Sequence, residues 1–184
     1  MSTAPILWEK SRPIKRVEYE KMVAMGLFGD ERVELLYGVI VEMPPKGPPH
    51  DSAIQRLTKR LVAAIGDRAD VRVQSAFAAS DGSEPEPDLA IVPAGGYREK
   101  HPDQAFLVIE VADSSLAIDR GTKAQLYAES GVPEYWVVNV RDAIVEVHTE
   151  IVRGVYTHVT PYRAGARVAL STFPDVVLEV ADIL

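Results

Sequence analysis

The sequence contains no cysteine, which excludes disulfides, cysteine-ligated zinc and thiol nucleophiles. It also lacks any apolar run near the roughly 18 residues that a membrane helix needs. Its beginning, MSTAPILWEKSRPIKR, does not follow the basic-then-apolar order of a signal peptide. We therefore expect a cytoplasmic protein with no membrane partner.

Positive charge is scarce as well. The chain has 20 Lys and Arg against 27 Asp and Glu, a net charge of −7. Proteins that coat nucleic acid without specificity usually carry a basic stripe, so this balance argues against that class. It does not exclude an enzyme with acidic metal ligands, because a bound metal offsets the charge of its carboxylates.

Several active-site motifs and all signs of modular organisation are absent. There is no Walker loop, dinucleotide-binding glycine pattern or Gly-x-Ser-x-Gly elbow, and no internal repeat or low-complexity linker. What is present is ordinary for a globular protein: 184 residues, 47% apolar and 26% charged. We expect a single domain over residues 1–184, with 1–16 as an irregular N-terminal arm.

Hydrophobic periodicity predicts strands interleaved with helices. The clearest helix is 50–65, with apolar residues at i, i+3 and i+4; others are expected at 17–26 and 116–130. Strands are expected at 38–43, 71–79, 88–92, 106–111, 134–140, 143–149, 156–160 and 176–180. This order predicts an α/β (α+β) fold, a mixed central sheet flanked by helices.

An acid, Asp88, stands at the mouth of one expected strand. Glu84, Glu86 and Asp88 alternate with Pro85 and Pro87. A residue before proline avoids the helical region, so this segment is extended and the acids point the same way. Asp88 would then begin the strand, with Glu84 and Glu86 further out in solvent.

A second acid, Glu110, interrupts the apolar run from Phe106 to Ala112. A carboxylate inside such a run is costly to bury unless it is paired or bound to a metal. Glu110 could equally lie at the solvent rim of its strand, or pair with a nearby Lys or Arg. The sequence leaves these interpretations open.

Lys123 falls on the apolar face of the helix expected at 116–130. Lysine seldom lies on a core face unless it is paired. Its stem could follow the apolar surface, or its ammonium could pair with Asp119 at i, i+4. The functional interpretation points the ammonium at Asp88 and Glu110, since two carboxylates and a lysine can hold a divalent metal and activate a water.

Other polar candidates lie on the helix expected at 50–65. His50 follows a proline-rich loop and is either an ordinary N-terminal residue or a group that binds phosphate or positions water. Arg56, Lys59 and Arg60 share the polar face, and they either contact a nucleic-acid backbone or form a solvated surface. Tyr127, in apolar surroundings, is expected to be a core aromatic.

Four segments, PDLAIV, LVIEVADSS, D-x3-K-x3-Y and GVPEYWVV, together resemble the Uma2 family of bacterial proteins, also called DUF820. The resemblance extends over roughly 17–147. It implies a restriction-endonuclease-like PD-(D/E)xK nuclease fold, in which Asp88 and Glu110 bind Mg²⁺ or Mn²⁺. It also implies that Glu34, in ELLYGVI, is a third acid, and it matches a family histidine to His50.

The lysine departs from the simplest form of that pattern. E-x-K spacing would place it at Ala112, so the resemblance implies that it has moved to the following helix as Lys123. There it would orient the attacking water or stabilise charge on the phosphate.

Three hypotheses follow. The first is a Mg²⁺-dependent endonuclease that hydrolyses DNA; the alternative is a catalytically inactive nuclease-fold protein with a binding or regulatory role. The third is a purely structural oligomer component. A homodimer is expected, with the hairpin at 134–149 and the apolar C-terminal strand as a face of the kind that nucleases of the resembled fold use to cut two strands.

Overall fold

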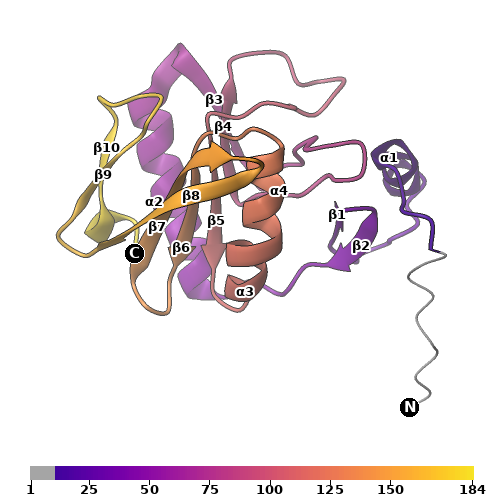
Figure 1. The fold of residues 1–184 in the computed structure, drawn as a ribbon, viewed down its shortest axis with the longest axis horizontal. Helices are drawn as coiled ribbons and strands as arrows, with labels where there is room; N and C mark the ends of the chain where they lie inside the picture. The colour runs from indigo at the N-terminus through magenta and orange to yellow at the C-terminus, as the bar shows by residue number, and fades with distance from the viewer. Residues whose placement is uncertain (1–10) are drawn as a thin grey trace.

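A computed structural model describes residues 11–184 and contains a six-stranded mixed sheet in the order β3-β4-β5-β6-β7-β8 (Figure 1). The strands are β3 Ala69–Val73, β4 Leu89–Pro93, β5 Leu107–Ala112, β6 Tyr135–Asn139, β7 Ile144–Val152 and β8 Val155–Arg163. Only β5 and β6 run parallel; the other neighbours are antiparallel. The expected mixed α/β fold is therefore confirmed. Residues 1–10 of the expected N-terminal arm lie outside the described part.

Helices cover the two faces of this sheet. On one face, Leu57 and Leu61 of α2 (Pro48–Ile65) pack in one core with strand residues such as Leu89 and Ile109. The alternate strand residues face the other way and form a second core with the helical segment that follows β5. The sheet is thus apolar on both sides, as the continuous apolar strands predicted.

The crossover between the parallel strands β5 and β6 carries the helix expected at 116–130. It consists of α3 (Leu116–Ile118), a π-helical turn at Asp119–Lys123 and α4 (Ala124–Glu129). The expectation of a regular α-helix is wrong for the middle turn. A π-helical turn takes one more residue per hydrogen bond, and such turns are frequent at functional sites.

A small N-terminal unit lies at one end of the molecule (Figure 1). It contains α1 (Arg16–Ala24) and the hairpin of β1 (Val33–Leu36) and β2 (Val39–Glu42). An isolated bridge between Leu35 and Glu84 joins this hairpin to the extended segment before β4. That bridge brings β1 beside the start of β4, although about 50 residues separate them in the chain.

The same bridge overturns the expectation that Glu84 lies in solvent. Its exposed fraction is 6%, and its Oε2 is 3.9 Å from the Arg16 guanidinium. Burial, together with a hydrogen bond to Glu20, raises the pKa of Glu84 to about 7. The folded state therefore favours the protonated form of this side chain.

Replacing Glu84 with glutamine should make stability less sensitive to pH. Because its pKa is raised on folding, the contribution of Glu84 is fully present below about pH 4.5 and is lost as pH rises through about 7. The effect should be on the order of 1–3 kcal/mol, or several degrees in melting temperature. In thermal melts, the melting temperature of Glu84→Gln relative to the parent should be higher at pH 8 than at pH 5. The exposed Glu31→Gln is the control, and an equal difference at both pH values would contradict the prediction.

The hairpin at 134–149 is not available as a homodimer face. β6 is buried throughout and the first part of β7 is buried, since both strands lie between β5 and β8. The C-terminal strand expected at 176–180 is β10 (Val177–Glu179), which pairs with β9 (Arg167–Ala169) as a separate hairpin. Within residues 11–184, no helix has both the length and the apolar character that crossing a membrane requires.

Candidate functional site

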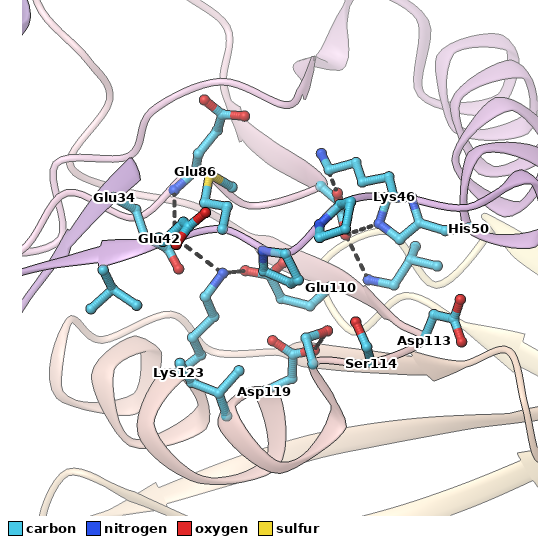
Figure 2. A pocket seen from close by; sticks show the side chains of 18 residues that line it. Glu34, Glu42, Lys46, His50, Glu86, Glu110, Asp113, Ser114, Asp119 and Lys123 are labelled. Atoms are coloured by element: carbon cyan, nitrogen blue, oxygen red, sulfur yellow. Dashed lines mark hydrogen bonds and ion pairs between the residues drawn. The ribbon is translucent and has the colours of Figure 1, made fainter. Parts of the chain in front are cut away.

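A cavity of about 60 Å³ lies where β4 begins and β5 ends, beside the N-terminus of α2 (Figure 2). Leu89 pairs with Ile109 in the antiparallel register of these strands. Asp88 precedes the first and Glu110 follows the second, so the register places the two acids opposite one another. Both line the cavity, and their exposed fractions are only 5% and 4%.

Asp88 is held by protein donors at both oxygens. Its Oδ2 accepts hydrogen bonds from His50 Nε2 at 3.0 Å and from the Val111 amide at 2.9 Å. Its Oδ1 lies 3.2 Å from Lys46 Nζ. Burial alone would raise the pKa of Asp88, but the hydrogen bond and charge of His50, the Val111 amide and Lys46 together lower it. Asp88 is therefore an ionised carboxylate inside the protein.

Glu110 and Glu34 share a single lysine. Lys123 Nζ lies 3.0 Å from Glu110 Oε1 and 3.1 Å from Glu34 Oε2. The Tyr127 hydroxyl donates to the same Glu110 oxygen at 2.7 Å, and the Glu86 amide donates to Glu34 Oε2 at 3.2 Å. Glu110 is thus neither at the solvent rim nor alone, and Lys123 meets these two acids rather than lying along an apolar surface.

The charge of this group is unbalanced, since one ammonium faces more than one carboxylate. Burial raises the pKa of Glu110, and Lys123 only partly offsets it; the negative charges of Asp119, Asp88 and Glu34 raise it further. Burial would lower the pKa of Lys123, but the carboxylates outweigh it and raise that pKa. The ammonium is therefore strongly held in its charged form.

The π-helical turn sets the positions of Asp119 and Lys123, both of which are buried. The Tyr135 hydroxyl donates to the Asp119 carbonyl oxygen at 3.0 Å, which ties the turn to β6. The Ser115 hydroxyl donates to Asp119 Oδ2 at 2.5 Å, and burial raises the pKa of Asp119 to about 6. Within the described residues Asp119 makes no ion pair with Lys123, so the i, i+4 pairing is wrong.

The cavity has the donor chemistry of a hard cation site. Carboxylates outnumber ammonium groups along its wall: Glu34, Glu42, Glu86, Asp88, Glu110, Asp113 and Asp119 face Lys46 and Lys123. Among residues 11–184, no three Asp, Glu or His side chains converge into a preassembled metal cluster. Mg²⁺ is commonly bound by one or two carboxylates with water and substrate phosphate, so oxygen donors such as these fit it.

Not every predicted residue belongs to this cavity. Glu34, His50, Asp88, Glu110 and Lys123 line it together. The basic face of α2 does not: Arg56, Lys59 and Arg60 line a separate hollow of about 650 Å³ against the C-terminal segment. Arg56 donates to the carbonyl oxygen of Leu184, and Arg60 pairs with Asp182 at 2.8 Å, so both arginines are partly engaged within the chain.

The sequence did not predict the role of two side chains at this site. Lys46 lies in the Pro-rich loop before α2, where no periodicity indicates which way a side chain points. Tyr127 is a fully buried core aromatic, as expected, but its hydroxyl also binds Glu110. A buried tyrosine usually finds a hydrogen-bond partner, so a contact of this hydroxyl could have been expected, although the sequence did not indicate Glu110 as its partner.

Comparisons with known proteins agree with the fold. The Uma2 family model, described as "Putative restriction endonuclease", matches residues 17–181. A solved structure, titled as a "putative nuclease belonging to DUF820" from Anabaena variabilis, matches with a TM-score of 0.76 at 15% identity. The alignment covers 93% of this chain and 97% of that one. Among curated proteins, none matches significantly.

Proposed function

The chain belongs to the Uma2 family, and from that premise we propose that it is a Mg²⁺-dependent endonuclease that hydrolyses DNA phosphodiester bonds. One observation carries the proposal. Two buried acids from adjacent strands, Asp88 and Glu110, face an acidic cavity that a buried lysine also lines. Buried charges at this density are costly to maintain for stability alone, which favours a functional role.

Each acid has a distinct role in this proposal. Asp88 and Glu110 hold the ion, and Glu34, which shares Lys123 with Glu110, is the third acid. A bound Mg²⁺ supplies a more acidic water and offsets negative charge on the phosphate. His50 fixes the orientation of Asp88 through its 3.0 Å hydrogen bond.

Within residues 11–184, Lys123 is one of two lysines that line the cavity, and it is the one that would act on the reacting phosphate. Its ammonium has three donors; it hydrogen-bonds Glu110 and forms an ion pair with Glu34, which leaves donor capacity for a water or a phosphate oxygen. Arg56, Lys59 and Arg60 lie outside the cavity and would contact the DNA backbone further along, which adds affinity without sequence preference.

Cleavage of supercoiled plasmid tests the proposal. The parent should nick or linearise DNA with Mg²⁺ or Mn²⁺ and should stop when EDTA is added. Asp88→Ala, Glu110→Ala and Lys123→Ala should each be slower, whereas the exposed Asp103→Ala should match the parent. Equal rates in all of these proteins would reject the assigned residues.

The alternative is a nuclease-fold protein that binds or regulates without catalysis. This alternative is favoured by the contacts of Asp88, because both of its carboxylate oxygens already have protein partners. Calorimetric titration with Mn²⁺ separates the two. Binding that Asp88→Asn and Glu110→Gln both abolish supports the endonuclease, and no such binding supports the alternative.

A further inference from the structure

Lys46 lies in a short proline-containing loop next to the start of α2. The loop, 43–47, joins β2 to α2; it contains Pro44, Pro45 and Gly47, and Pro48 is the first residue of the helix. Proline fixes φ and restricts the residue before it, so the backbone is constrained before Lys46, whereas Gly47 leaves it freer after Lys46. The side chain nevertheless reaches inward, with an exposed fraction of 15%, and lines the cavity.

The two oxygens of Asp88 differ in what holds them. Oδ2 is fixed by a helix side chain, His50, and by a strand amide, that of Val111. Among the contacts of residues 11–184, the one partner of Oδ1 is the Lys46 ammonium, at 3.2 Å. Oδ1 is therefore the oxygen that a metal would use, and Lys46 occupies the space beside it.

The hold of Lys46 is weak compared with that of the other cavity lysine. Lys123 Nζ has both Glu110 and Glu34 within 3.1 Å. Lys46 Nζ is buried and, within the described residues, makes no hydrogen bond of good geometry beyond its ion pair with Asp88. A buried ammonium with unused donors is poorly compensated, so moving it outward to water costs little. In Figure 2, Lys46 and His50 lie on the opposite side of Glu110 from Glu34 and Lys123.

We propose that Lys46 is a displaceable counter-ion of Asp88: its ammonium neutralises Oδ1 in the metal-free protein and moves away when a divalent cation takes that oxygen. The inference rests on the cation site of the proposed function and assigns a role to a residue outside the acid and lysine set. Lys46 thus acts on metal binding through Asp88: its ammonium occupies the space beside Oδ1 until a cation displaces it, while His50 and the Val111 amide hold the carboxylate at Oδ2.

The first test is the affinity for Mn²⁺, measured by calorimetry on the parent, Lys46→Met and Lys46→Arg. Removing the competing charge should tighten Mn²⁺ binding about tenfold, whereas arginine, which keeps the charge, should not. Lys100→Met is the matched control, because it removes one exposed lysine from a loop that does not line the cavity. A residue with a purely structural role would weaken binding when lost.

The second test uses the unaltered protein and so does not depend on a variant folding. Lysine-reactive ester labelling followed by mass spectrometry should show Lys46 protected without metal and more reactive with Mn²⁺. Lys100 should label equally in both conditions.

The outcomes separate this inference from the proposed function. Suppose that Asp88→Asn abolishes Mn²⁺ binding, but Lys46→Met leaves it unchanged or weakens it. This result overturns the displacement of Lys46 and leaves the metal site standing. Unchanged Lys46 labelling with bound Mn²⁺ does the same. If neither the parent nor Lys46→Met binds Mn²⁺, both the displacement of Lys46 and the metal site are overturned.

Discussion

Replacing Glu110 with glutamine should lower Mg²⁺-dependent plasmid cleavage about a thousandfold, because losing a proposed ligand weakens the hold on an ion that would supply several kcal/mol of transition-state charge stabilisation. The protein should stay folded. Burial already raises the pKa of Glu110, and glutamine resembles the neutral acid that burial favours. Lys123 keeps Glu34 as a partner at 3.1 Å in this variant, so no buried ammonium is left alone.

The measurement is the nicking rate of supercoiled plasmid, with Asp103→Asn as the matched control. Asp103 is an exposed acid in the loop between β4 and β5, so its amide variant should cut at the parent rate. A Glu110→Gln protein that melts like the parent and cuts like the parent would remove Glu110 from the ligand set. Loss of cleavage with a large fall in melting temperature would instead indicate a role in folding.

Local sequence patterns predicted most of the fold and indicated the candidate acids. Glu110 stands out because it interrupts an apolar strand, and Asp88 because Pro85 and Pro87 force an extended entry to its strand. The pairing of Leu89 with Ile109 then brings the two acids together without any further signal. Most helices and strands with clear periodicity were placed to within a few residues, but the strand expected at 71–79 is wrong in its second half, since β3 ends at Val73.

The misplaced features depend on contacts that no local pattern encodes. Glu84 is buried because it pairs with Leu35, which lies far away in the chain. Lys46 points inward because it forms an ion pair with Asp88. A proline-rich loop has no periodicity that would indicate this direction. The π-helical turn at 119–123 was not predicted, because the expected helix assumed a regular α-helical rotation of 100° per residue throughout. These features combine tertiary pairing with local conformation, which single-sequence patterns do not contain.

Replacing Lys123 with methionine should destabilise the metal-free protein by about 3–5 kcal/mol, the range for removing one partner of a buried ion pair. The side chain is 6% exposed, and its loss leaves Glu110 and Glu34 without their shared cation. Cleavage should also fall, by about a hundredfold, because the ammonium proposed to stabilise charge on the phosphate is gone. Denaturant unfolding and plasmid nicking measure the two effects.

The pH dependence of that loss, and a double variant, show whether unpaired carboxylates cause it. Without the ammonium, Glu110 has its pKa raised on folding still further, so its stabilising effect is present at low pH and lost as pH rises. The deficit of Lys123→Met against the parent should therefore be larger at pH 8 than at pH 5. Adding Glu110→Gln to Lys123→Met should recover part of the lost stability, because one stranded carboxylate becomes neutral. Purely additive losses would instead mean that Lys123 acts through the packing of its stem, and would remove the electrostatic basis for its proposed role.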